Sequence, residues 1–358
     1  MPLIMIRSSR TEIATAWFGA LCFFLSAVEY LIPKPLPFLR LGLANLPIML
    51  ATEILPLPAF AVLVLVKILA QGLIGGTLFS YIFLFSAAGT LSSALLMYLL
   101  ALPGKRRISY AGISVAGAFA SNAAQLGMAR WYIFGPSAWY IAPPFLAVGA
   151  VSGLLLGLFA NRFASRSQWL EGLRSGTGSL PKDAFDPDSG AQTGPAARKQ
   201  GFFNAPAFRA AAGFAFLGVL LFSDNPAIQG AVVAAAAVLL ICDGGKISPV
   251  PALVMTAGII GFNLLTPFGK VLYQPFGLPI TEGALLSGIQ KALTVEGMLF
   301  ISRWMMKSGF RLPGKPGELI ARVLSILGYL TARKSRFDPK EPIASIDRIM
   351  LGDETEPR

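Results

Sequence analysis

Side chains that could bind a small molecule lie inside apolar segments of the first half of the chain. They are one carboxylate and four amides: Glu29, Asn45, Gln71, Asn122 and Gln125. An amide offers a hydrogen-bond donor and an acceptor in one plane, which suits a heterocycle or a polar head group. Asn122 and Gln125 are three residues apart, so on a helix they share one face. We therefore predict that these five side chains bind a small organic solute.

The segment 41–47, Leu-Gly-Leu-Ala-Asn-Leu-Pro, would place part of this site on irregular backbone. It follows an apolar stretch that ends near Glu29, and its glycine and proline oppose a regular helix. Irregular backbone at membrane depth is stable only where it faces protein or a water-filled cavity. Ionisable groups in such places are candidate functional residues. The pairing of this segment with Glu29 therefore favours an internal binding cavity.

The same polar residues also have purely structural interpretations. Amides can simply join membrane helices through hydrogen bonds, each worth about 0.6 kcal/mol. Glu29 could pair with Lys34 or Arg40 at the membrane surface. For Lys67 and Glu53 we favour mutual neutralisation across neighbouring helices over contact with a ligand. From the sequence alone, the choice between ligand contact and helix packing stays open for the amides and for Glu29.

Several kinds of catalytic and cofactor site are missing from the sequence. It contains no histidine, which excludes Ser-His-Asp and Cys-His catalysis and removes the commonest transition-metal ligand. No G-x-x-x-x-G-K-[ST] motif occurs, so we expect no ATP binding through a P-loop. No Asp-Asp-x-x-Asp occurs either, so Mg²⁺ and a diphosphate would have no visible ligands. We therefore predict that the chain is not an enzyme and has no metal site and no cofactor.

Composition indicates that these residues are carried by helices in a membrane. The 358 residues are 54% hydrophobic and only 13% charged, with a mean hydropathy of +0.64. Soluble proteins carry about 25% charged residues. An apolar run of about 20 residues can cross a bilayer, so we predict an all-α polytopic membrane protein with about ten transmembrane helices. The expected spans are roughly 14–32, 42–55, 57–75, 77–102, 108–129, 140–160, 209–222, 226–242, 248–265 and 284–305.

The positions of the charges predict the orientation of these helices. With the N-terminus in the cytoplasm, most of the 30 Lys and Arg residues fall in cytoplasmic segments, as the positive-inside rule requires. An even number of spans returns the C-terminus to the cytoplasm. The net charge of +12 is then explained by topology. We therefore expect contact with the lipid bilayer and no nucleic-acid partner.

The predicted helices divide into two membrane domains. Residues 1–160 would form a six-helix bundle, and residues 209–336 would form a four-helix domain that ends in a basic, partly amphipathic helix. Residues 161–208 are rich in Ser, Gly, Pro, Asp and Arg, which is typical of a flexible cytoplasmic linker. Residues 337–358 would form a polar tail.

Small residues mark faces on which helices can approach each other closely. Gly149, Gly153 and Gly157 form two consecutive GxxxG steps, and Ala16 and Ala20 form a milder step of the same kind. Such faces pack either within one bundle or against another membrane subunit. Both interpretations stay open from the sequence.

The first half of the chain resembles a known family. The resemblance is carried by Glu29 to Pro33, Leu41-Gly42-Leu43-Ala44-Asn45, Phe79-Ser80-Tyr81 with Gly89, and Gly112 to Ala118 leading to Asn122 and Gln125. Through them, residues 14–160 resemble the Gx transporter family, also described as heptaprenyl diphosphate synthase component I. That family is similar to the six-helix substrate-binding S components of energy-coupling factor transporters. The resemblance implies a protein of the bacterial inner membrane that binds a vitamin-like solute such as a flavin.

The second half more weakly resembles a T component of the same transporters. The features are the turn from Gly277 to Gly283, the helix through Arg303, and two Ala-Arg steps at Arg322 and Arg333. T components use small-Arg-Gly motifs to seat on ATPases, although no glycine follows either arginine here. The resemblance implies that Arg322 and Arg333 couple the chain to separate ABC-type ATPase subunits, with or without a separate T component.

Together these features predict a membrane transport subunit of the energy-coupling factor type, made as a fusion of an S and a T component. It would bind a small organic solute and use ATP hydrolysis on partner proteins. The alternative is a membrane component of heptaprenyl diphosphate synthesis, which the other description of the family suggests.

Overall fold

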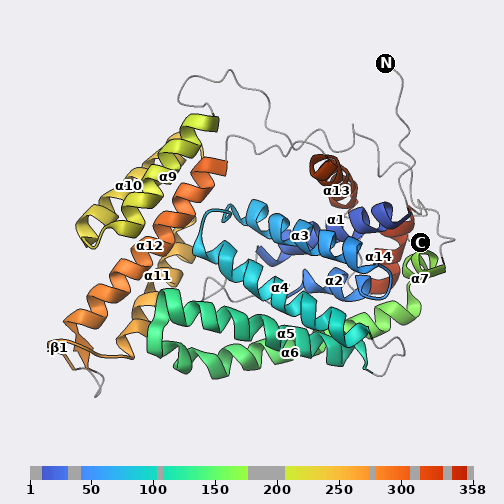
Figure 1. Ribbon diagram of the computed structural model, residues 1–358, viewed down its shortest axis with the longest axis horizontal. Helices are drawn as coiled ribbons and strands as arrows, with labels where there is room; N and C mark the ends of the chain where they lie inside the picture. The colour runs from blue at the N-terminus through green and yellow to red at the C-terminus, as the bar shows by residue number, and fades with distance from the viewer. Residues whose placement is uncertain are drawn as a thin grey trace.

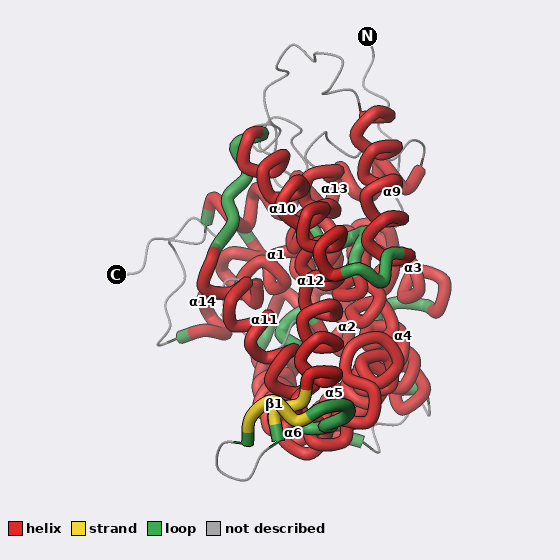
Figure 2. The backbone as a smooth tube through the Cα atoms, turned by 90° about the vertical axis from the view of Figure 1, so that its left-hand side faces the viewer, coloured by secondary structure: helices red, strands yellow, loops and turns green. Residues whose placement is uncertain are grey.

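The computed structural model describes residues 10–30, 42–102, 108–175, 206–274, 279–306, 315–333 and 341–352. Within these ranges the chain is almost entirely helical, apart from loops and one two-stranded hairpin. Figure 1 shows two groups of helices, with α9 to α12 lying across one end of the bundle formed by α1 to α6. Figure 2 shows the same arrangement from the side, with the short hairpin in yellow at one end.

The first group is the helical bundle that contains the predicted site. Its helices are α1 (Arg10–Tyr30), α2 (Asn45–Ala51), α3 (Leu57–Gly75), α4 (Tyr81–Ala101), α5 (Tyr110–Ala129) and α6 (Ala138–Arg166). A π turn, η1 (Arg130–Phe134), and a 3-10 turn, η2 (Gly135–Ser137), connect α5 to α6. Local sequence sets two of these boundaries. The Ser109 hydroxyl accepts a hydrogen bond from the Gly112 N–H at the start of α5, and Gly76 ends α3 in the left-handed conformation, as an N-cap serine and a terminal glycine commonly do.

The second group is a smaller helical domain. It contains α9 (Pro206–Phe222), α10 (Pro226–Cys242), α11 (Pro249–Leu264) and α12 (Glu282–Met306). The first three helices begin with proline, whose fixed φ suits the first helical position. Between α11 and α12, strands β1 (Val271–Tyr273) and β2 (Ile280–Thr281) pair in antiparallel fashion.

The described helices confirm a multi-pass membrane architecture but differ from the expected spans. Five segments are long and apolar enough to cross a bilayer, and the one at Tyr110–Arg166 includes both α5 and α6. Helix α2 has only 7 residues, so it extends about 10 Å and cannot cross the bilayer alone. The expected second span is therefore wrong, because the turn before Asn45 and the break after Ala51 leave room for only two helical turns. Helices α9, α10 and α11 are shorter than 18 residues, and whether they cross stays a prediction.

Three further helices pack against the first bundle. They are α7 (Gln168–Ser175), α13 (Lys315–Ala332) and α14 (Pro342–Leu351), and Figure 1 shows them gathered near the start of α1. Trp17 of α1 makes edge-to-face contacts with Trp169 of α7 and Tyr329 of α13, with ring centroids 6.3 and 6.0 Å apart. The C-terminal part of the chain therefore returns to the first bundle. Helices α7 and α14 lie inside the segments that we expected to be a linker and a polar tail, and residues 176–205 lie outside the described part.

The GxxxG glycines of α6 allow this helix to pack closely on α5 inside the bundle. A Cβ added at Gly157 would lie 2.5 Å from the Ala111 Cα, and one added at Gly153 would lie 3.2 Å from the Ser114 carbonyl oxygen. The backbones of α5 and α6 therefore touch along this face. The milder step on α1 is also covered, because Ala16 and Ala20 are both fully buried, and Val323 of α13 lies 3.0 Å from the Cβ position of the adjacent Gly19. Both faces serve packing within this chain.

We expect Asp347 of α14 to hold the C-terminal helices in place. Its carboxylate accepts hydrogen bonds from the Ser167 hydroxyl, at 2.5 Å, and from the Gln168 N–H, at 2.6 Å, at the start of α7. Asp347→Ala should weaken this contact by about 1–2 kcal/mol and speed cleavage of the C-terminal segment in limited proteolysis of the purified protein. Arg348→Ala is the control, because Arg348 is a partly exposed neighbour paired with exposed Glu341. Equal cleavage of the two variants would contradict this role.

Candidate functional site

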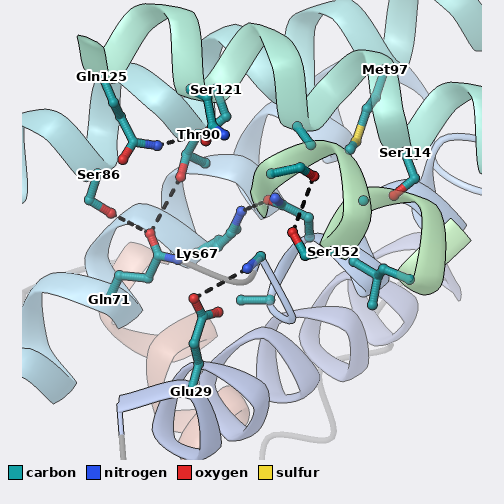
Figure 3. Close-up of a pocket in the computed structure, with 18 residues that line it drawn as sticks. Glu29, Lys67, Gln71, Ser86, Thr90, Met97, Ser114, Ser121, Gln125 and Ser152 are labelled. Carbon is teal, nitrogen blue, oxygen red and sulfur yellow. Dashed lines mark hydrogen bonds between the residues drawn. The ribbon is translucent and has the colours of Figure 1, made fainter. Parts of the chain in front are cut away.

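A cavity inside the first bundle is lined by all five side chains that the sequence singled out. Glu29 comes from α1, Asn45 from the start of α2, Gln71 from the end of α3, and Asn122 and Gln125 from α5. Figure 3 shows polar side chains converging on this cavity from α1, α3, α4, α5 and α6. Sequence reasoning gave Lys67 only a structural role and missed the hydroxyls. The hydroxyl groups belong to Ser86, Thr90, Ser114, Ser121 and Ser152.

The turn before α2 is held by side chains from two helices. The Glu29 carboxylate accepts a hydrogen bond from the Gly42 N–H, at 3.2 Å, and the Lys67 ammonium donates one to the Asn45 side-chain oxygen. Gly42 adopts a φ of +82°, a conformation that glycine reaches without steric cost. Of the segment predicted to be irregular, residues 42–44 form this turn, whereas Asn45 to Pro47 already belong to α2 and residue 41 lies outside the described part. The turn and the start of α2 form one wall of the cavity, with a buried cation and a buried carboxylate beside it.

Glu53 has a different partner from the one that we favoured. Its carboxylate lies 2.7 Å from Arg174 of α7, which also donates a hydrogen bond to the Tyr110 hydroxyl, at 2.9 Å. Lys67 instead lines the cavity. The expected neutralisation of Lys67 by Glu53 is therefore wrong. The reason is that Glu53 follows the end of α2 and faces α7, whose position the sequence did not reveal.

Gln71 joins α3 to α4 on the opposite wall. Its side-chain oxygen accepts hydrogen bonds from the hydroxyls of Ser86 and Thr90, the latter at 3.4 Å, as Figure 3 shows. The loop between these helices contacts the second domain, because the Phe79 N–H donates to the buried hydroxyl of Ser302 in α12, at 3.0 Å. A single short loop thus connects the cavity wall with α12.

The two amides of α5 differ in their hydrogen bonding. The Asn122 Nδ2 donates to the Phe145 carbonyl oxygen of α6, at 3.1 Å, and the Gln125 Nε2 donates to the Ser121 hydroxyl, at 2.8 Å. The Gln125 side chain is only 3% exposed, yet its Oε1 has no hydrogen-bond partner among the described residues. A buried acceptor without a donor costs about 1–3 kcal/mol. This oxygen is therefore the atom of the cavity wall at which we most expect a hydrogen-bond donor from a bound molecule or a water.

The cavity is nearly closed in this conformation. The volume that a water-sized molecule can occupy is about 30 Å³, which is enough for about two waters. A larger solute would have to displace polar side chains or move one of the walls. Among the described lining residues, Gly42 and Ala44 are the ones outside helices. The turn that contains them, and the loop that follows α3 after Gln71, can move with the least disruption of helix packing.

Of the two arginines expected to couple to ATPases, Arg322 lies on α13 and Arg333 directly follows the end of that helix. Arg322 is 3.9 Å from the Glu12 carboxylate of α1, and the Arg333 guanidinium lies over the Tyr329 ring, 3.8 Å from its centroid. Both contacts are within the chain, the first with the start of α1 and the second with α13 itself. Coupling to an ATPase stays a prediction. Among the described residues no group of three or more His, Cys, Asp or Glu side chains could hold a metal ion.

Comparison with known families matches the two halves separately. Residues 18–163 match the family described as Heptaprenyl diphosphate synthase component I, which is the family that the sequence resembles. Residues 205–308 match a domain of unknown function, DUF8519. No curated protein and no solved structure matches the chain.

This match corrects one expectation. We predicted that the chain is not an enzyme, but the matching family is described as a component of a synthase, which points to an enzyme-related role. The prediction failed because a lack of catalytic motifs only indicates that the chain does not catalyse a reaction by itself. A component can contribute to a reaction whose catalytic groups lie on another subunit.

Proposed function

We propose that the first bundle binds a small polar organic solute in the cavity between Glu29, Lys67 and Gln125, as a subunit of an energy-coupled membrane transport system. The observation that carries this proposal is the unpartnered Gln125 oxygen in a polar cavity surrounded by membrane-length helices. A buried polar interior of this kind is costly unless it is used. An oxygen that needs a donor favours a solute with N–H or O–H groups.

The second domain would transmit movement to the cavity. Its helix α12 contacts the loop after Gln71 through the hydrogen bond between Ser302 and Phe79. The helix that follows, α13, packs on α1, which supplies Glu29. Both contacts connect the second half of the chain to a wall of the cavity. This arrangement supports a role for residues 206–333 in coupling, with Arg322 and Arg333 as the proposed contacts for separate ATPase subunits.

A second candidate is a membrane component of heptaprenyl diphosphate synthesis, and the description of the matching family favours it. In that role the same cavity would bind part of an isoprenoid diphosphate, with the Lys67 ammonium beside the anionic group. A lone cation attracts a diphosphate, but the described residues provide no carboxylate cluster to hold a metal ion with it. The chemistry would then require a partner subunit.

Chemical identification of what the protein carries tests the binding role and separates the two candidates. The full chain is purified in detergent, and small molecules released by denaturation are identified by mass spectrometry. A polar, vitamin-like compound supports the transport role, whereas an isoprenoid diphosphate supports the second candidate.

We expect Gly89→Ala to reduce the amount of this compound. A Cβ at Gly89 would lie 2.5 Å from the Gln125 Nε2 and 2.7 Å from the Ser121 hydroxyl, so the methyl group must displace both side chains. Gly127→Ala is the matched control, because it lies on the same helix as Gln125 with nothing within 4 Å of its Cβ position. We expect about a tenfold loss in the first variant, equivalent to about 1.4 kcal/mol, and none in the second. Equal amounts in both variants and the wild type would contradict the assignment of the cavity.

A further inference from the structure

We propose that Glu296, in α12, is a proton-binding site of the second membrane domain, and that its carboxyl group carries a proton in the conformation described here. This site lies outside the solute cavity and does not depend on the function proposed for that cavity. The sequence offers Glu296 no adjacent charged partner. Lys291 is five residues away and does not share a face of α12 cleanly with Glu296, and Arg303 shares its face but lies about two turns further along the helix.

Glu296 is buried with almost no hydrogen-bonding groups around its carboxyl group. Its side chain is 6% exposed, and neither carboxylate oxygen has a partner among the described residues. The neighbouring polar group is the Thr256 side chain of α11, which can supply one hydrogen bond at most. An ionised carboxylate in this position would have lost its water without gaining a counter-charge or a set of donors. The neutral acid avoids most of that cost.

The residues on either side of Glu296 place it inside the protein, away from lipid. Val295 packs in the core shared with the first bundle, together with Met255 and Ile259 of α11. Gly297 faces the other way, where its Cβ position lies 2.7 Å from Leu220 of α9. Glu296 therefore sits between the two packed faces of α12. Acidic groups in such intramembrane positions are functional more often than structural.

The charged groups of the same helix do not neutralise Glu296 by direct contact. Lys291 donates a hydrogen bond to the Asn263 side-chain oxygen of α11, at 2.8 Å. Arg303 acts on Glu296 only through longer-range attraction, since seven residues along a helix correspond to about 10 Å.

The other packed elements offer no counter-charge either. On α9, Arg209 lies 2.8 Å from Asp243 at the end of α10. On α10, the Gln229 amide donates to the carbonyl oxygens of Leu220 and Ser223. The first bundle contributes Tyr81, a neutral group in the shared core. No positive group of these elements forms a described ion pair with Glu296.

A proton fits this environment better than a metal ion. Sodium, potassium and divalent cations need several oxygen ligands, and the described residues contain no group of three or more acidic, cysteine or histidine side chains. A proton needs only one oxygen atom of the carboxylate. When α12 separates from α11 and water enters, the O–H bond can break, the proton passes to water, and the carboxylate remains. Movement of α12 would thereby be linked to proton release.

Infrared spectroscopy of the full-length protein in lipid tests this proposal. We expect the wild type at neutral pH to show the C=O stretch of a protonated carboxylic acid, and Glu296→Gln to lose it, because glutamine imitates the neutral acid in shape. Glu282→Gln is the control, since Glu282 is exposed at the start of the same helix, and this variant should keep the band. If Glu296→Gln instead removes only carboxylate absorption, the proposal is wrong.

Chemical labelling of the wild type provides a test that needs no variant. Hydrophobic carbodiimides react with protonated carboxyl groups within membranes, and the modified peptide can be identified by mass spectrometry. We expect labelling at Glu296 that falls as the medium becomes alkaline. Absence of labelling, or protection by sodium or potassium salts at constant ionic strength, would overturn the proposal in favour of a buried ion pair or a cation site.

Discussion

Gly157→Ala is expected to separate α5 from α6 and to destabilise the first bundle by about 2 kcal/mol, within the range measured for overpacked cores. The added Cβ would lie 2.5 Å from the Ala111 Cα and 2.8 Å from the Tyr110 carbonyl oxygen. Both atoms belong to backbone, so no side chain can rotate away. The expected result is a clear fall in the thermal unfolding midpoint of the detergent-purified protein.

Gly127→Ala is again the matched control for this effect. Gly127 lies on α5, and nothing is within 4 Å of its Cβ position. Alanine favours a helix over glycine by up to about 1 kcal/mol, so this variant should be as stable as the wild type or slightly more stable. If Gly157→Ala unfolds at the same temperature as Gly127→Ala, the close packing of α5 on α6 is wrong.

Lys67→Met is expected to remove most of the bound solute while leaving the protein folded. The Lys67 side chain is only 2% exposed and lines the cavity. Methionine fills a similar volume, but removing a cation beside a buried carboxylate lowers stability, so the thermal unfolding midpoint is measured together with solute retention. Loss of a hydrogen bond to a charged group costs about 1.5–3 kcal/mol, so solute retention should fall at least about tenfold. The measurement is the molar ratio of solute to protein after purification.

A half-buried lysine of the second domain provides the control for Lys67. Lys291 also donates to the side-chain oxygen of an asparagine, in its case Asn263, but it lies in the other domain. Lys291→Met therefore makes the same chemical change away from the cavity and should leave solute retention unchanged. Equal retention in the two variants would mean that Lys67 holds only the turn before α2.

Much of the first bundle could be predicted because its signals are local. The irregular segment at Gly42 and Asn45 and the amides of α5 mark the cavity by residue type and spacing alone. The missing hydrogen-bond partner of the Gln125 Oε1 could not be predicted from the sequence, because it depends on where Ser121 and α4 lie. The hydroxyls of Ser86 and Thr90 gave no signal either, since serine and threonine are common in membrane helices, where they often bond their own backbone.

Long-range contacts explain most of the differences from the sequence predictions. Asp347 and Ser167 are 180 residues apart, and no local pattern predicts that α14 caps α7. The position of α7 also brings Arg174 to Glu53, while Lys67 donates to Asn45 in the cavity wall. Helix α2 was predicted too long because hydropathy counts apolar residues and does not register the breaks at Gly42 and after Ala51. The sequence analysis kept a synthase component only as an alternative, because the link to an enzyme comes from the description of the matching family and not from a catalytic motif in the chain.

The most direct test of the cavity is an experimental structure of the full-length protein purified gently in native lipids. We expect density for an organic molecule inside the first bundle, with a donor atom within hydrogen-bond distance of the Gln125 Oε1 and a polar group near the Lys67 ammonium. The walls at Gly42 and at the loop after Gln71 should lie further apart than in the closed conformation described here. A fully packed interior that holds only water beside Gln125, in protein shown to be active in cells, would contradict the account.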